Sequence, residues 1–331
     1  MTQPNPMETA MPLPRLGATA LALVLPALPA LAQDFPLTLE HRFGTTVIEA
    51  PPERVASLDF NGADNLLALG VQPVVVRDWY GDHPRGVWPW ADALLEGEPE
   101  VLRGGLDFEQ IAGADPDVIV AIWSGITAEE YERLSRIAPV VAVPEGVGDY
   151  ALPWDELALL AGRAVGRKAE AEAQVAAIRD RLAGIAGAHP EWQGLTAAVA
   201  GAFEGEVGAY TSADIRPIVL AELGFRVPEA IDARVGANEF WVTFSQENLS
   251  PLDADLLLWI DGEDGFAAVE ALAARPFLKA HQEGRELFLG EEITAAFSHG
   301  SLLSLPLAID RLVPMIEAAL DGNPETHADD R

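Results

Sequence analysis

Short apolar segments alternate with helical patterns along most of this chain. The segments carry Val, Ile and Leu without a polar residue at every second position, which is typical of strands buried on both faces of a parallel sheet. The predicted strands are 54–58, 73–76, 117–122, 140–143, 195–202, 256–260 and 286–289, preceded by a hairpin at 38–48. The predicted helices are 63–69, 108–114, 128–137, 153–162, 215–223, 269–273, 274–280 and 306–320. This order predicts an α/β fold with mostly parallel sheets covered by helices.

One long helical pattern divides this alternation into two halves. Residues 167–185 predict an amphipathic helix that spans roughly 30 Å at about 1.5 Å per residue. Its apolar face carries Val175, Ile178, Leu182 and Ile185. The 331 residues are too many for one ordinary core and suit two lobes. We therefore predict two Rossmann-like α/β lobes, joined by a single long helix that restricts opening, with a ligand cleft between them.

The first 32 residues have the pattern of a cleavable signal peptide. Arg15 gives a sparse positive region, 16–28 an apolar stretch, and Ala30-Leu31-Ala32 a small-x-small cleavage site. The start codon is left open between Met1, Met7 and Met11. No later segment reaches about 18 consecutive apolar residues, the length that suits a membrane span. We therefore predict an exported, periplasmic protein, and the lack of cysteine leaves no residue for a lipid anchor.

These patterns together give the predicted domain boundaries. They are 1–32 for the signal peptide, 33–150 for the N-terminal lobe, 151–190 for the linking helices, 191–322 for the C-terminal lobe and 323–331 for a disordered tail.

Composition excludes several classes of function. The chain has 21 Lys and Arg against 52 Asp and Glu, a net charge of −31, which opposes binding to nucleic acid or anionic lipid. With no cysteine, disulfides, thiolate catalysis and cysteine-ligated metals are ruled out. The sequence also has no P-loop, no GxSxG elbow and no GxGxxG fingerprint. We expect a binding protein with no catalytic residue, no metal site and no cofactor of its own.

An internal correspondence links the two halves. Glu109 and Glu247 lie 138 positions apart, and so do Asp117 and Asp255. In each half the pattern predicts a capped short helix that leads into a buried strand. Two matched lobes are a natural way to form a cleft for a ligand.

Seven segments, in the same order, resemble those of a known family. They are PERVASLD at 52–59, LLALGV at 66–71, DFE at 107–109 with PDVI at 116–119, YERLSRIAP at 131–139, GRAVGR at 162–167, residues 240–261, and SLLSLPLAIDRL at 301–312. Over residues 40–320 the chain resembles the helical-backbone periplasmic binding proteins that serve iron-siderophore, haem and cobalamin importers. The C-terminal half is most similar to siderophore-binding members. The resemblance implies two α/β lobes, one linking helix, a shallow cleft with little closure, a monomer, and an ABC permease as partner.

The resemblance also assigns roles to three residues. It implies that Glu109 and Glu247, one on the top of each lobe, pair with arginines of the permease and so fix its orientation. Alternatively, Glu109 is only a charge in the first turn of a helix. Arg103 matches a basic position that contacts the chelate in some members, where a guanidinium suits the oxygen shell of a ferric siderophore.

Further candidates for chelate contact are arginines and tryptophans near predicted strand ends and in the second half. They are Arg77, Arg216 and Arg234, with Trp79, Trp123 and Trp241. The alternatives are surface arginines and ordinary core packing, and core packing is what we expect of Trp154, Trp192 and Trp259. Haem ligation by His83, His299 or Tyr210 also stays open.

The predicted function is capture of a ferric siderophore outside the cytoplasm and its delivery to an ABC import permease. Haem or cobalamin is the alternative ligand within the same class. A different class, an exported sensor, interaction module or enzyme on this scaffold, also stays open because a fold does not fix a function.

Overall fold

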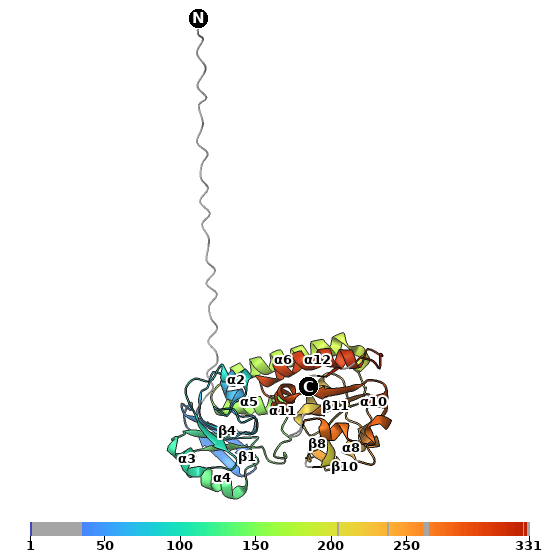
Figure 1. Ribbon diagram of the computed structural model, residues 1–331. Coiled ribbons are helices and arrows are strands. Elements are labelled where there is room, and N and C mark those ends of the chain that lie inside the picture. Colours follow the sequence, from blue (N-terminus) through green and yellow to red (C-terminus); the bar gives the residue numbers. More distant parts are fainter. Residues whose placement is uncertain (2–34, 204, 237, 261–264, 327, 330–331) are drawn as a thin grey trace. The chain divides into compact units, whose positions relative to one another are not determined.

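The computed structural model describes residues 1, 35–203, 205–236, 238–260, 265–326 and 328–329. The predicted signal peptide and its cleavage site lie outside the described residues, apart from Met1. The described residues from 35 onward belong to one compact unit. Its elements form an α/β fold with two larger sheets and a two-stranded hairpin, which confirms the predicted fold class (Figure 1).

The sheet of the first lobe is entirely parallel. Its strands run in the order β5-β4-β3-β6-β7. Their bounds are β3 Val55–Ser57, β4 Pro73–Asp78, β5 Glu100–Arg103, β6 Val118–Ala121 and β7 Val140–Ala142. The helices are α1 Asp64–Ala68, α2 Pro89–Asp92, α3 Phe108–Gly113 and α4 Ala128–Leu134. β3, β6 and β7 are buried along their whole length, as their unbroken apolar sequences predict.

A hairpin precedes this sheet, as predicted. It consists of β1 (Leu37–His41) and β2 (Gly44–Ile48), paired antiparallel. The hydroxyl of Thr46 donates to the carbonyl oxygen of Val140 at 2.6 Å, which ties the hairpin to β7.

The sheet of the second lobe is mixed. Its order is β10-β9-β8-β11-β12-β13, and β9 and β10 run antiparallel to their neighbours while the remaining pairs are parallel. The strands are β8 Ala197–Phe203, β9 Glu206–Tyr210, β10 Trp241–Phe244, β11 Leu256–Ile260, β12 Glu286–Leu289 and β13 Ala328–Asp329. The helices are α7 Ile215–Glu222, α8 Glu229–Asp232, α9 Ala267–Glu270, α10 Lys279–Gln282, α11 Glu291–His299 and α12 Ser304–Ala319, with short 3-10 turns at Pro190–Trp192, Ser250–Leu252 and Arg275–Phe277.

The second lobe differs from the prediction in three places. The sequence analysis gave no strand for β9 or β10 and no helix for α11. It also predicted a disordered tail at 323–331, whereas Ala328–Asp329 pair with β12 as β13. A two-residue edge strand is held by backbone hydrogen bonds and needs no apolar pattern. The sequence therefore gives no pattern from which β13 could be predicted.

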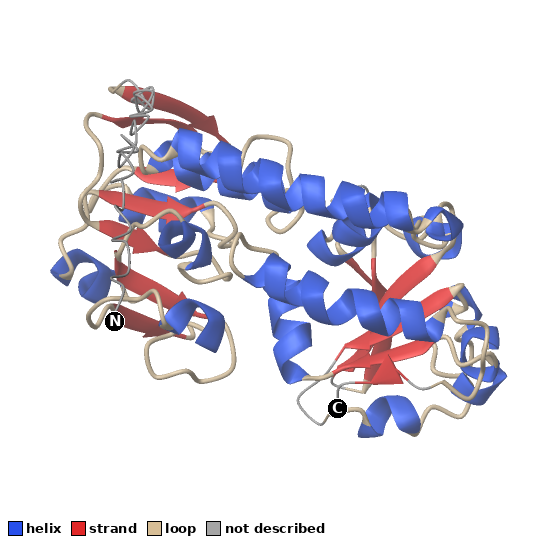
Figure 2. Ribbon diagram, turned by 90° about the horizontal axis from the view of Figure 1, so that it is seen from above, coloured by secondary structure: helices blue, strands red, loops and turns tan. Residues whose placement is uncertain are grey.

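Two helices connect the lobes, α5 (Trp154–Ala164) and α6 (Lys168–Ala188). Figures 1 and 2 show α6 running from the first sheet to the second, alongside α12. At its start Gln174 donates to the carbonyl oxygen of Ala68 in the first lobe, and further along Arg181 forms an ion pair with Asp310 of α12. The predicted apolar face is largely buried, with Val175, Ile178 and Leu182 inside. One apolar core cluster therefore continues from the first lobe through α5 and α6 into the second.

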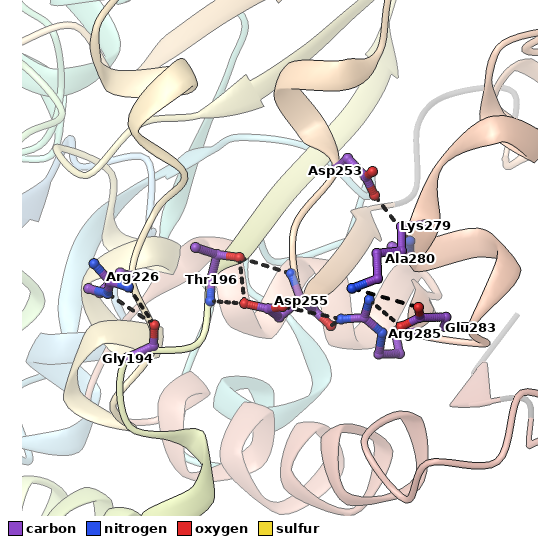
Figure 3. A network of polar contacts seen from close by, with 9 residues as sticks. All are labelled: Gly194, Thr196, Arg226, Asp253, Asp255, Lys279, Ala280, Glu283 and Arg285. Atoms are coloured by element: carbon purple, nitrogen blue, oxygen red, sulfur yellow. Dashed lines mark hydrogen bonds and ion pairs between the residues drawn. The ribbon is translucent and has the colours of Figure 1, made fainter.

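Matched aspartates directly precede one parallel strand in each sheet, β6 and β11. Asp117, just before β6, accepts hydrogen bonds from the backbone N–H groups of Glu53 and Arg54 at 2.7 and 3.1 Å. Asp255, just before β11, accepts from the backbone N–H and the hydroxyl of Thr196, both at 2.9 Å (Figure 3). Each carboxylate thus fixes the start of the neighbouring parallel strand, β3 or β8, relative to its own.

We predict that Asp255→Ala lowers the free energy of unfolding by about 1–2 kcal/mol, because it removes two hydrogen bonds to a carboxylate. Burial alone would raise the pKa of Asp255, but Thr196, Arg285 and Lys279 hold it below 3.8. The carboxylate therefore contributes stability above pH 3.8 that is lost as the pH falls through its lowered pKa. Urea denaturation at neutral and at acid pH measures both effects.

The control is Asp180→Ala, which removes an exposed carboxylate on α6 and should change stability by less than about 0.5 kcal/mol. Equal stability of the Asp255 and Asp180 variants would contradict the proposed role of Asp255.

Candidate ligand-binding cleft

The ends of several strands place aromatic side chains around one cavity. Trp79 and Tyr80 follow β4, while Phe203 and Ile260 close β8 and β11. The carboxyl ends of parallel strands are where open α/β sheets bind ligands. The cavity has a volume of about 610 Å³ and is lined by Trp79, Tyr80, Gly81, Phe203, Tyr210, Arg216, Ile260, Gly265, Glu291, Thr294 and Ser298. Both lobes therefore contribute to its wall.

A second cavity of about 240 Å³ shares Trp79, Tyr210 and Arg216 with the first. Its remaining lining residues are Phe60, Trp123, Tyr150, Asp214 and Phe240. Because the two cavities share three side chains, we treat them as one site and call it the cleft. Its walls are mainly aromatic, which suits the flat or apolar faces of an organic ligand.

Arg216 is a buried charge in the wall of the cleft. It lies in the first turn of α7, and its Nε and Nη2 donate to the two oxygens of Asp214 at 2.7 and 2.8 Å. Its Nη1 donates to the hydroxyl of Ser298 at 3.0 Å, and its Cζ lies 3.4 Å from the centre of the Tyr210 ring. Burial would lower the pKa of Arg216, but the Asp214 carboxylate outweighs burial and raises it. Arg216 is therefore a fixed, charged group that is already paired.

Several buried donors of the first lobe lack hydrogen-bond partners among the described residues, and two of them lie at or next to the cleft. The Nε1 of Trp123 is buried and has no hydrogen-bond partner within the described residues, and Trp123 is only 3% exposed. The Nε of Arg77 is in the same state, although its Nη1 donates to the carbonyl oxygen of Ser124 at 2.9 Å. The guanidinium of Arg77 lies 3.9 Å from the centre of the Phe60 ring. Because Trp123 lines the cleft, its N–H is suited to meet a ligand oxygen.

His299 of α11 inserts into an aromatic cluster of the first lobe. Its ring centre lies 5.4 Å from that of Trp79 and 5.5 Å from that of Trp90. Tyr80 and Trp88 also contact it, at 5.8 and 6.0 Å. Its Nδ1 lies 2.9 Å from a carbonyl oxygen one turn earlier in α11. A residue of the second lobe thus helps to hold Trp79 in the cleft wall.

Polar contacts next to His299 join the same two lobes. The hydroxyl of Ser301 donates to Asp64 at 2.7 Å, and the backbone N–H of Leu302 donates to the side-chain oxygen of Asn65 at 3.0 Å. Trp90 also donates to Asp64, at 2.8 Å. Every one of these groups except Trp90 is buried, so the contacts are shielded from water.

Gly300 makes this junction between the lobes possible. It ends α11 with φ of 53°, a left-handed conformation that favours glycine. A Cβ at this position would also collide with the side chain of Ile215. The turn directs Ser301 toward the first lobe.

The predicted ligand contacts divide into two groups. Trp79, Trp123 and Arg216 line the cleft. Trp241 packs behind it, with its ring centre 4.7 Å from that of Tyr210 and 5.5 Å from that of Phe203.

Arg103 and Arg234 are not among the residues that line the two cavities. Arg103 forms ion pairs with Asp78 and Asp82 at 2.5 and 3.4 Å and also donates to the carbonyl oxygen of His83. Arg234 lies over the ring of Phe244, 4.8 Å from its centre. The structure therefore gives a direct chelate contact by Arg103 or Arg234 no geometric support, because local partners engage both guanidinium groups.

Sequence reasoning missed several lining residues. Phe203, Glu291 and Thr294 were not selected, and Tyr210 was considered only as a haem ligand. Phe203 and Glu291 border β9 and α11, two elements that the pattern did not predict. The aromatic run at Trp79 and Tyr80 was the available signal for Tyr80.

Glu109 and Glu247 are both exposed. In the described part of the chain, neither carboxylate has a hydrogen-bond or ion-pair partner. Glu109 lies in α3, where Asp107 accepts from its backbone N–H at 3.0 Å. The predicted matching helix around Glu247 is wrong: Glu247 lies in a turn, where the Ser245 hydroxyl accepts from its N–H at 3.3 Å before a 3-10 turn. The two sites share a capped backbone N–H but not a helix.

Residues 55–291 match the model of the periplasmic binding protein family. The chain belongs to this family. The chain is 29% identical over 232 residues to the probable siderophore-binding lipoprotein YfiY of Bacillus subtilis, covering 67% of this chain and 68% of that protein. It is 30% identical over 202 residues to the Fe(3+) dicitrate-binding periplasmic protein FecB of Escherichia coli, covering 61% and 65%. The aligned part thus spans about two thirds of each of these relatives.

Solved periplasmic binding proteins match more of the chain. A periplasmic solute binding protein from Mycobacterium smegmatis is 35% identical with a TM-score of 0.73, covering 86% of this chain and 98% of that one. The Streptococcus pneumoniae protein PiaA, solved in complex with ferrichrome, is 26% identical with a TM-score of 0.74, covering 86% and 99%. The family is one of extracytoplasmic substrate-binding proteins.

Among the residues that the structure describes, no helix is long and apolar enough to cross a membrane. Over the same residues, no three His, Cys, Asp or Glu side chains gather as they would around a metal ion.

We predict that His299 makes the stability of this periplasmic binding protein depend on pH. Burial lowers the pKa of His299 from 6.5 to about 4, so the unfolded chain takes up a proton that the folded one does not. Stability is therefore complete above pH 6.5 and falls as the pH drops toward 4, by up to about 1.4 kcal/mol per pH unit. Thermal unfolding of wild type and His299→Gln across this window measures the difference.

The variant should lose less stability than wild type between pH 6.5 and 4. Burial raises the pKa of Asp64 to about 6, which acts in the opposite direction, but Asp64 is present in both proteins and cancels in the comparison. Parallel pH profiles of the two proteins would show that His299 does not titrate in this range.

Proposed function

We propose that this protein captures a ferric siderophore outside the cytoplasmic membrane and delivers it to an ABC importer. The observation that carries the proposal is the aromatic cleft of about 610 Å³ between two lobes of a periplasmic binding protein. Pockets of roughly 300–1,000 Å³ hold ligands of drug size, and a ferric siderophore is in that class. The named ligands of the relatives, ferric dicitrate and ferrichrome among them, support an iron chelate as cargo.

The cleft contains what an oxygen-rich organic chelate needs. Trp79, Phe203 and Tyr210 provide aromatic surface for its organic backbone. Trp123 offers an unpaired N–H for an oxygen atom. We infer binding without chemistry, since the family is one of substrate-binding proteins and the cleft carboxylates are a paired Asp214 and an exposed Glu291. The protein therefore has no cofactor in this proposal, and the iron is cargo.

Tryptophan fluorescence tests the proposal directly. We predict saturable quenching of the purified mature protein by at least one ferric chelate, and loss of most of that signal in Trp79→Phe, because Trp79 lines both cavities. The control is Trp192→Phe, whose indole is 1% exposed and stacks on His189 at 3.9 Å outside the cleft. This control should keep the quenching.

Other outcomes of the same titration redirect the proposal. Saturation only by haem or cobalamin would retain an importer and replace the ligand. No response to any ferric chelate would reject siderophore capture.

We further propose that Glu109 and Glu247 contact the permease. Both are exposed, and both lack partners within the described residues. One carboxylate in each lobe gives a two-point contact that sets orientation as well as attraction. In this proposal the protein acts as a periplasmic monomer, exported through cleavage near residue 32.

We predict that Glu109→Ala combined with Glu247→Ala abolishes uptake of radioactive iron chelate without changing chelate affinity, since neither residue lines the cleft. The host is a strain whose own copy of the gene is deleted. A matched double variant, Glu98→Ala with Glu156→Ala, removes two other exposed carboxylates and should support normal uptake. Full uptake by the Glu109 and Glu247 variant would exclude the docking role and favour a sensor or another permease surface.

A further inference from the structure

We infer that the cargo is a ferric chelate with no net negative charge, such as a tris-hydroxamate, rather than an anionic citrate or catecholate chelate. This inference rests on the proposed function and narrows its ligand. Two features support it: the balance of charges in and around the cleft, and the carboxylates that already pair with Arg216 and Arg103.

The described lining of the cleft carries no excess positive charge. Arg216 is its one lining cation among the described residues, and Asp214 neutralises it through two hydrogen bonds. Glu291 lines the larger cavity and is exposed at the start of α11. Arg77 lies over the Phe60 ring, outside the lining of both cavities, and has no ion-pair partner among the described residues. Its positive charge and the negative charge of Glu291 sum to zero, so the cleft and its surroundings have no net positive charge.

The other candidate arginines do not alter this balance. Arg103 is held by Asp78 and Asp82, so its charge is compensated where it lies. Arg234 lies against Phe244, outside the lining of both cavities. An anion brought into the cleft would therefore lose its hydration and meet no net positive charge among the described residues.

The charge of an iron chelate depends on its iron-binding groups. Each hydroxamate loses one proton on binding, so three of them cancel the charge of Fe³⁺. Each catecholate loses two protons, so three leave the complex at a net charge of minus three, and citrate complexes are also anionic. The cleft matches the first class, because its aromatic walls need only a neutral surface to pack against.

The charge of the whole protein also disfavours an anionic chelate. The net charge of −31 repels anions during the approach to the cleft. At physiological salt this repulsion is screened over about 8 Å, so it affects the rate of encounter more than the bound state. The charges within the cleft set the affinity.

Three probes separate the classes. They are ferrichrome as the neutral tris-hydroxamate, ferric dicitrate as a carboxylate anion, and a ferric tris-catecholate. Titration of the mature protein by tryptophan fluorescence, at low and at high NaCl, gives each affinity. We expect ferrichrome to bind at least about tenfold more tightly than either anion, a difference of about 1.4 kcal/mol, with an affinity that salt leaves unchanged.

A pair of charge variants tests the cause. Glu291→Lys places a cation in the lining and should raise the affinity for ferric dicitrate, relative to that for ferrichrome, several-fold. Glu98→Lys makes the same change of charge in an exposed loop before β5, at the amino ends of the parallel strands, whereas the cleft lies at their carboxyl ends. It should leave both affinities as in wild type.

Each outcome decides one point. Tighter binding of an anionic chelate, weakened by salt, would overturn the inference and leave siderophore capture intact. Equal gains from Glu291→Lys and Glu98→Lys would show that charge in the cleft does not select the ligand. Binding of none of the three probes would reject the proposed function, and the inference with it.

Discussion

The apolar core that runs through α5 and α6 is the constraint on which the cleft depends. In most two-lobed proteins each lobe buries its own core, and the connection between them can bend. Here one cluster of buried side chains includes residues of both sheets and the inner face of α6, with Val175, Ile178 and Leu182 at its centre. Opening the lobes would expose part of that cluster to water, which costs free energy in proportion to the apolar area uncovered. The walls of the cleft are therefore set before a ligand arrives, and little binding energy is spent on ordering them.

Buried polar contacts fix the relative arrangement of the two lobes that this packing holds together. An apolar core tolerates sliding, whereas the bonds from Ser301 to Asp64 and from Leu302 to Asn65 exist in only one arrangement of the lobes. His299 has a similar effect through its ring contacts with Trp79 and Trp90. Residues outside the lining of the two cavities thus determine where the aromatic wall lies.

The sequence predicted the parts of the fold that carry their own pattern. Buried parallel strands such as β6 and β11 appear as unbroken apolar runs, and α6 appears as an apolar stripe. β9 was missed because its sequence, EVGAY, contains Gly208 and small residues instead of a branched apolar run. Its place in the sheet comes from pairing with β8 and β10, which is information that lies elsewhere in the chain.

Dependence on distant parts of the chain also explains which residues of the candidate site could be predicted. Trp79 and Trp123 follow predicted strands and could be placed at the edge of a sheet, where they do line the cleft. Arg103 also ends a strand, but Asp78 and Asp82, its partners, lie more than twenty positions earlier in the chain. Such distant neighbours determine where a guanidinium lies, so residue type and position alone could not show that Arg216 lines the cleft and Arg103 does not.

A shared core has a kinetic consequence for any partner that recognises both lobes. A receptor whose lobes share a core would present nearly the same outer surface whether it is empty or loaded, so the spacing of Glu109 and Glu247 would not differ between the two states. Occupancy can then be read only at the mouth of the cleft, where groups such as Glu291 are exposed. Empty copies would occupy the same docking surface as loaded ones and act as competitive inhibitors of import. The rate of uptake would then depend on the fraction of receptor that holds cargo, and excess unloaded receptor would slow transport.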